Sequence, residues 1–283
     1  MGLDKFYTQP QVAEQCYKFL IKKLPIVQDK QFLEPSAGNG SFLEYLPNYI
    51  ALDILPEDNR IVQQDFFSYE PTYQHFITIG NPPFGHRSVL AIDFFNHASK
   101  FSDVIAFIVP VSFMKWGVQK ELDNSFKLLD YFTLEPESFF DEGVPYSVRT
   151  VFQIWVKTNS EYDLGRNKRI LSSPPISHPD FDIWQYNATV QAENTIEQDW
   201  EIATYRQGYH DYNQLFTHDD YEYIKEKMIN RPKQQFFFIK PKTENARKII
   251  LSMDFNNLAE RNISTPGFGK GDFVSYYNEL TTA

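Results

Sequence analysis

Short apolar runs alternate with segments of helical spacing through the first half of the chain. This alternation predicts βαβ units that form a mainly parallel sheet. Strands are expected at seven places, residues 31–34, 49–53, 61–65, 76–80, 104–109, 128–134 and 148–157. Helices are expected between them, at residues 10–24, 41–45, 89–100 and 115–124. The last strand follows a Gly-Val-Pro turn, so it is expected to pair antiparallel with its neighbour.

The pattern changes after residue 158. Residues 159–169 are polar, and Pro174, Pro175 and Pro179 follow within a few positions, which is typical of a linker. Beyond them the chain is rich in aromatic residues with weak periodicity. We therefore predict an α/β fold of Rossmann-like type in residues 1–158 and a smaller carboxyl-terminal region in residues 159–283.

Composition narrows the class of protein. The chain has 283 residues, 42% of them hydrophobic, and its apolar runs are short, which argues against a membrane span. The single cysteine, Cys16, excludes a disulfide framework and lies at helical spacing among apolar residues, as a core residue would. The six histidines show no spacing typical of metal ligands, so no metal is expected. No charged-then-apolar leader is present, which makes the cytoplasm the expected location.

Charge argues weakly against a nucleic-acid partner. Lysine and arginine number 27 against 37 acidic residues, a formal net charge of −10, whereas nucleic-acid-binding proteins carry a basic face. One stretch differs: residues 225–248 hold eight basic residues and two acids. Its lysines Lys240 and Lys242 are candidates for phosphate contacts. A solvated surface with no ligand is an equally good interpretation of this basic island.

A glycine turn is the strongest local signal. The sequence Glu34-Pro-Ser-Ala-Gly-Asn-Gly40 follows an expected strand and precedes an expected helix. Glycines at such a turn let the backbone approach a nucleotide-like ligand, and a helix start offers free N–H groups. A tight strand-to-helix turn without a ligand is the alternative.

Acidic residues end the next two expected strands. Asp53 lies where a doubly wound sheet places a carboxylate against ribose hydroxyls. Asp65 could accept a hydrogen bond from an adenine amine while the ring of Phe66 packs on the base. With Glu34, they place three acids at the carboxyl ends of successive strands, where ligands bind in this architecture.

The fourth expected strand leads into Asn81-Pro82-Pro83-Phe84. Two prolines remove backbone donors, so the Pro82 carbonyl and the Asn81 side-chain oxygen can both accept hydrogen bonds from an amine. Phe84 offers a flat face for stacking. Two acceptors aimed at a conjugated amine nitrogen would stabilise the positive charge that develops as this nitrogen attacks a methyl carbon.

These motifs, in this order, resemble the S-adenosylmethionine-dependent adenine-N6 DNA methyltransferases. Phe6-Tyr7-Thr8-Gln9-Pro10 resembles the amino-terminal cofactor motif of that group, EPSAGNG its glycine loop and NPPF its catalytic tetrad. Residues 106–114, AFIVPVSFM, resemble its fifth-strand segment. The resemblance covers about residues 1–157 and implies a class I methyltransferase fold with a seven-stranded sheet and an antiparallel last strand.

Carried over by position, the resemblance implies roles for named residues. The implied cofactor-binding residues are Tyr7, Thr8, Glu34, Ala37, Gly38, Gly40, Asp53, Asp65 and Phe66. The implied catalytic residues are Asn81, Pro82 and Phe84, with Pro83 beside them. Phe139 or Phe140 would cover the other face of an extruded base. In the carboxyl-terminal region, Arg206 is the candidate for base recognition.

The leading hypothesis is methyl transfer from S-adenosylmethionine to the N6 amine of adenine in DNA. RNA adenine methylation would use the same pocket, because an unstacked adenine needs no flipping. Protein glutamine methylation and a non-catalytic partner protein are further alternatives. The sequence leaves open whether a partner subunit or a restriction endonuclease accompanies the chain.

Overall fold

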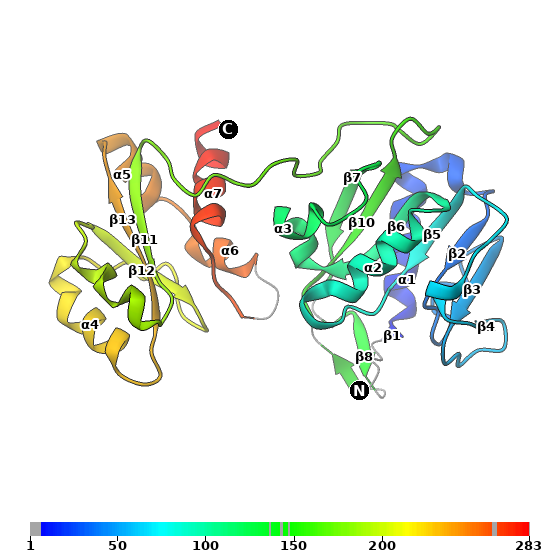
Figure 1. Cartoon of the computed structure of the whole chain (residues 1–283), viewed down its shortest axis with the longest axis horizontal. Coiled ribbons are helices and arrows are strands. Elements are labelled where there is room, and N and C mark those ends of the chain that lie inside the picture. Colours follow the sequence, from blue (N-terminus) through cyan, green and yellow to red (C-terminus); the bar gives the residue numbers. More distant parts are fainter. Residues whose placement is uncertain (1–6, 136, 142–143, 147, 262–264, 283) are drawn as a thin grey trace. The chain divides into compact units, whose positions relative to one another are not determined.

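The computed structural model describes residues 7–135, 137–141, 144–146, 148–261 and 265–282. Phe6, at the start of the amino-terminal motif, lies outside these residues. The chain divides into two compact units, residues 1–171 and 172–283. Figure 1 shows a mixed α/β first unit and a second unit with a small sheet of its own. In the described part of the chain, no helix is long and apolar enough to cross a membrane.

A seven-stranded sheet forms the centre of the first unit, with strand order β4-β3-β2-β5-β6-β10-β7. The strands are β2 (Phe32–Glu34), β3 (Tyr49–Asp53), β4 (Val62–Gln63), β5 (Phe76–Gly80), β6 (Ser102–Pro110), β7 (Phe126–Thr133) and β10 (Thr150–Lys157). The pairs among β2, β3, β4, β5 and β6 are parallel, and β10 runs antiparallel to both β6 and β7. The predicted fold class, with its antiparallel last strand, is confirmed.

Helices cover both faces of this sheet (Figure 1). Ile154 of β10 belongs to the same apolar core as Cys16 and Leu20 of α1 (Pro10–Lys23). The next residue, Trp155, packs instead on Phe95 of α2 (Val89–Ala98), with ring centroids 5.4 Å apart. Because successive residues of a strand point to opposite faces, α1 and α2 lie on opposite sides. Covering on both faces explains why β6 is almost continuously apolar.

Two predicted helices differ from the structure. Residues 41–45 form consecutive turns, with the N–H of Leu43 bonded to the Gly40 carbonyl and that of Tyr45 to the Phe42 carbonyl. Five residues before Pro47 are too few to continue a helix past its costly first turn. The helix predicted at residues 115–124 is reduced to α3 (Trp116–Gln119), after the short 3₁₀ helix η4 (Val111–Met114).

A second, three-stranded sheet of the first unit was not predicted. Its order is β1 (Tyr7–Thr8), β8 (Phe139–Asp141) and β9 (Val144–Tyr146), all antiparallel. Two- and three-residue strands have no readable period, and the partners of β1 lie more than 130 residues away in the sequence. This small sheet fixes the amino-terminal motif beside the main sheet.

The first unit extends past the predicted boundary at residue 158, because residues 159–171 pack on it. Tyr162 is buried, and the Arg169 guanidinium donates to the backbone carbonyls of Gln119, Leu122, Asp123 and Phe126 at 2.7–2.8 Å. A buried cation needs this many acceptors. The linker therefore begins near residue 172 rather than at residue 159.

The second unit is an antiparallel sheet with helices around it. Its strands are β11 (Phe181–Tyr186), β12 (Ile202–Gln207) and β13 (Gln235–Pro241), with β13 in the middle. Its helices are α4 (Tyr221–Ile229), α5 (Glu244–Leu251), α6 (Phe255–Glu260) and α7 (Lys270–Thr282). An aromatic core that includes Trp200, Phe237 and Phe273 holds these elements together, which accounts for the aromatic composition of this region.

Candidate active site

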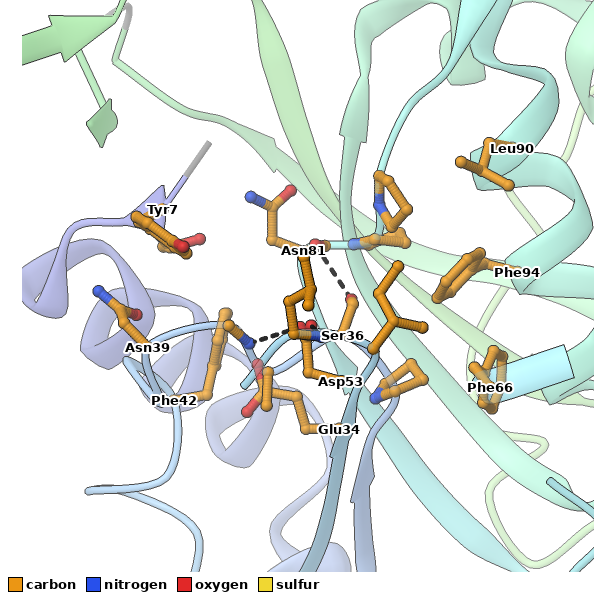
Figure 2. Close-up of a pocket in the computed structure, with 18 of the residues that line it drawn as sticks. Tyr7, Glu34, Ser36, Asn39, Phe42, Asp53, Phe66, Asn81, Leu90 and Phe94 are labelled. Carbon is orange, nitrogen blue, oxygen red and sulfur yellow. Dashed lines mark hydrogen bonds between the residues drawn. The ribbon is translucent and has the colours of Figure 1, made fainter. Parts of the chain in front are cut away.

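A cavity of about 350 Å³ opens at the carboxyl ends of β2, β3 and β5. Figure 2 shows Tyr7, Glu34, Asp53 and Asn81 around it, each from a different segment of the chain. Parallel strands end at one edge of a sheet, so residues distant in sequence meet there. The cavity thus brings together the amino-terminal motif, the glycine turn, the strand-end acids and the Asn-Pro-Pro-Phe segment.

The glycine turn lines the cavity through Ala37 and Gly38. Gly38 has φ 55° and Gly40 has φ 80°, a left-handed backbone that favours glycine. The N–H of Gly38 donates to Asp53 Oδ2 at 2.8 Å, and the N–H of Gly40 to the Ala37 carbonyl at 2.7 Å. Gly40 shapes the turn without lining the cavity. Turns and no helix follow, so the helix start predicted at residues 41–45 is absent.

Glu34 is the most unusual group in the cavity. Its side chain is 2% exposed, and its Oε2 atom has no hydrogen-bond partner in the described part of the chain. Burial, together with the nearby charge of Asp53, raises the pKa of Glu34 to about 8. A buried carboxyl with an unused oxygen is costly unless a ligand completes it.

The other two acids are held by backbone groups. Asp53 accepts hydrogen bonds from the N–H groups of Gly38 and Leu55, both at 2.8 Å. Asp65 accepts one from the N–H of Phe67 at 3.0 Å, as the cap of the short 3₁₀ helix η2 (Phe66–Ser68). Both carboxylates are therefore fixed in place at the cavity.

The Asn81–Phe84 segment forms the wall next to Glu34. The hydroxyl of Ser36 donates to the backbone carbonyl of Asn81 at 3.2 Å, which ties the segment to the glycine turn (Figure 2). Pro82 is buried, Pro83 is partly exposed, and the Phe84 carbonyl accepts the N–H of Ala91 in α2 at 3.3 Å. All four residues of the segment line the cavity.

Apolar residues that the sequence interpretation missed also line the cavity. Ile54, Leu55 and Phe67 line it and are 44%, 48% and 40% exposed. Exposed apolar side chains inside a cavity are typical of a surface that binds an apolar ligand. The missed signal was readable, because apolar residues directly follow both strand-end acids. The ring of Phe66 is only 1% exposed and packs on Phe94, 5.1 Å between centroids, so Phe66 lines the cavity from within the core.

Phe139 and Phe140 do not line the cavity, contrary to the predicted cover of a base. Phe139 is fully buried in the core of the first unit, and Phe140 is partly buried and pairs with Tyr7 across β8 and β1. Neighbouring strand residues face opposite sides, which separates the two rings. In the small sheet, Tyr7 and Thr8 of β1 line the cavity, and β8 lies behind them as their pairing partner.

The basic island of residues 225–248 is largely paired with acids of its own unit. Five of its eight cations lie within 4.0 Å of a carboxylate. The pairs are Lys225–Glu197, Lys233–Glu193, Lys240–Asp199, Lys242–Asp182 and Arg247–Glu201. Such exposed pairs are weak and exchangeable. The island is therefore part of a mixed-charge surface, in which most of its cations face acids from outside the stretch.

Arg206 is partly buried on β12 and donates to Gln235 Oε1 of the neighbouring strand β13. Burial lowers the pKa of its guanidinium. The structure thus holds Arg206 against the sheet of the second unit, while Tyr209, in the loop that follows, is 81% exposed.

The strand order, the antiparallel β10 and the cavity at the ends of the parallel strands define the first unit as a Rossmann-like class I methyltransferase fold. No protein-family model and no curated protein matches the chain. Solved structures do match parts of it. One is a Pyrococcus horikoshii protein provisionally described as an RNA methyltransferase, with 18% identity and a TM-score of 0.43 over 55% of this chain and 88% of that chain.

Two further solved structures match about half of the chain. The 23S rRNA methyltransferase ErmE has 13% identity and a TM-score of 0.38 over 57% of this chain and 73% of that chain. A chain of a type I restriction–modification system has 15% identity and a TM-score of 0.38, over 53% of this chain and 44% of that chain.

Proposed function

We propose that the chain is an S-adenosylmethionine-dependent methyltransferase that modifies the exocyclic N6 amine of adenine in DNA. One observation carries this proposal: a single cavity joins the buried Glu34 carboxyl, with its unused oxygen, to the two acceptors expected of the Asn81–Phe84 segment. The first suits a cationic ligand, and the second suits an amine.

The residues of the cavity fit the proposed cofactor. Glu34 would pair with a positive charge of its methionine end, and Asp53 would accept hydrogen bonds from ribose hydroxyls. Asp65 would accept from the adenine amine, with Ile54 and Phe67 packing on the ring. When bound, S-adenosylmethionine supplies an electrophilic methyl group.

The Asn81–Phe84 segment would hold the target. The Asn81 side-chain oxygen and the Pro82 carbonyl accept hydrogen bonds from the amine, and this stabilises the nitrogen as it becomes positive. Phe84 stacks on the base. A duplex adenine must leave the stack to reach this cavity, so the target base is flipped out.

The substrate class can be tested by methyl transfer in parallel assays. Tritiated S-adenosylmethionine is incubated with the protein and unmethylated duplex DNA, single-stranded DNA, total RNA or a protein extract. We expect label in duplex DNA and none with the Asn81→Ala variant. Label confined to RNA or to protein would keep the chemistry but replace the substrate. Cofactor binding without label anywhere would indicate a non-catalytic protein.

Asp53→Ala is expected to raise the Kd of S-adenosylmethionine at least about tenfold, because hydrogen bonds to an ionised acceptor are removed. Calorimetric titration measures this Kd. Asp53 also accepts hydrogen bonds from the N–H groups of Gly38 and Leu55. Asp53→Asn keeps one acceptor oxygen, so its Kd should lie between that of the wild type and that of Asp53→Ala. Glu44→Ala is the control, because Glu44 pairs with Arg60 and does not line the cavity. An unchanged Kd in Asp53→Ala would remove Asp53 from the ribose site.

We further propose that the second unit contributes to target recognition through Lys240 and Lys242. Reversing both charges should weaken DNA binding and lower the slope of log affinity against log salt by about two, roughly 0.9 for each DNA phosphate that is no longer neutralised. Fluorescence anisotropy at several salt concentrations measures this slope. The control reverses Lys18 and Lys22, both exposed on α1 of the first unit. Equal slopes in both variants would make the basic island an ordinary solvated surface.

A further inference from the structure

A hydrogen bond joins two walls of the cavity. Tyr7 lines the cavity from β1, and its hydroxyl donates to Oε1 of Glu57, fifty residues later in the loop between β3 and β4. Glu57 itself does not line the cavity. Neither the motifs nor the fold assigns a role to Glu57.

The same two residues close around the glycine turn. The N–H of Glu57 donates to the Gly38 carbonyl at 2.9 Å. The ring of Tyr7 lies so close on the other side that a Cβ atom on Gly38 would be 2.9 Å from its Cε1. Tyr7, Glu57 and Gly38 therefore form a closed ring of contacts beside Asp53, which accepts the Gly38 N–H.

The rest of β1 is held independently of this bond. Thr8 pairs with Phe139 across β8, and its carbonyl accepts the hydroxyl of Ser41 at 2.7 Å. The backbone of β1 is thus fixed, and the Tyr7 side chain extends from it to Glu57. Burial and the bond to Glu57 raise the pKa of Tyr7, which keeps its hydroxyl a donor at neutral pH.

We propose that the Tyr7–Glu57 hydrogen bond is a clasp that retains the cofactor, and that Glu57 is a positioning residue acting through Tyr7. The identity of the ligand rests on the proposed function; the clasp itself rests on the contacts above. While the bond is formed, Tyr7 and the loop that carries Glu57 stay together and slow release of the ligand from the Glu34 end. When the bond breaks, Tyr7 can turn away from Gly38.

Removing the clasp should speed release more than it changes the chemistry. Tyr7→Phe keeps the ring and loses the hydroxyl, and we expect cofactor dissociation to be about tenfold faster, the effect of one hydrogen bond to a charged group. Glu57→Ala should match it, Glu57→Gln should restore much of the loss, and the double variant should add nothing further. Stopped-flow competition measures the dissociation rate, and single-turnover methyl transfer by Glu57→Ala, a residue outside the cavity, should change less than twofold.

Two results would overturn the clasp. One is a pair of additive effects in the Tyr7→Phe, Glu57→Ala double variant, and the other is an unchanged dissociation rate in both single variants. Glu44→Gln is the control, since Glu44 is an exposed acid outside the cavity.

A measurement without ligand separates this inference from the proposed function. In the free protein, Glu57→Ala should increase amide hydrogen exchange in residues 54–57, the loop that the bond ties to Tyr7, and leave the exchange of β6 unchanged. If the wild type does not bind S-adenosylmethionine, the proposed function fails while this exchange result still decides the clasp. Unchanged exchange in residues 54–57 would contradict the clasp whatever the ligand is.

Discussion

Asn81→Ala is expected to slow methyl transfer at least about a hundredfold while the Kd of S-adenosylmethionine stays within about twofold. The substitution removes an acceptor at the reacting nitrogen, where charge develops only in the transition state. The Ser36 hydroxyl bonds the backbone carbonyl of residue 81 rather than its side chain, so the turn beside the cofactor should survive. Single-turnover transfer and calorimetric titration measure the two quantities.

A matched variant separates loss of the acceptor from loss of shape. Asn81→Asp replaces the amide by a carboxyl group of almost the same size and keeps an oxygen acceptor, so it should retain more activity than Asn81→Ala. If Asn81→Ala lost cofactor affinity as much as rate, Asn81 would be assigned to cofactor binding instead of to the target amine.

The affinity for S-adenosylmethionine is expected to rise about tenfold per pH unit between pH 6 and pH 8, and then to level off. The pKa of Glu34 is raised to about 8 in the free protein, so Glu34 is protonated at pH 6 and must release its proton to pair with a cation. Proton release on binding can be measured by calorimetry in buffers of different ionisation enthalpy. Glu34→Gln should bind weakly and lose this pH dependence.

The other titratable groups that line the cavity are Tyr7, Asp53 and Asp65. Burial raises the pKa of Tyr7, so its hydroxyl stays protonated in this range, whereas the pKa of Glu34 is raised into it. Glu34 is therefore the group expected to titrate between pH 6 and pH 8. A flat pH dependence in the wild type would contradict a cationic partner for Glu34.

The same pKa shift affects folding with a defined sign. Because the folded protein binds the Glu34 proton more tightly than the unfolded chain, the contribution of Glu34 to the stability of the ligand-free protein should fall as pH rises from about 4.5 to about 8. Glu34→Gln should lessen this fall, as thermal unfolding at several pH values would measure.

The strands and the site were predictable where one local rule decides the outcome. Asp53 and Asp65 end predicted strands, and parallel strands place such ends at one edge, so their place at one cavity with Asn81 followed from the order of elements. Burial on both faces made the middle strands readable as continuous apolar runs.

The remaining features depend on contacts between distant residues. Nothing near Glu57 in the sequence indicates Tyr7 as its partner, and the choice of Phe139 for the core depends on the register of β8 against β1. Lys240 appeared basic within its own stretch, yet its partner Asp199 lies 41 residues earlier. Registers and ion pairs of this kind are set by tertiary packing rather than by local propensity.

The most direct test of the proposed activity identifies the methylated atom. Duplex DNA without methylated adenine is incubated with the protein and S-adenosylmethionine that carries a deuterated methyl group, then digested to nucleosides for mass spectrometry. We predict that the wild type yields N6-deuteromethyl-deoxyadenosine and that Asn81→Ala does not. Deuterium on a different base or atom, or none in DNA despite bound cofactor, would contradict the assignment of Asn81–Phe84 as an adenine-amine site.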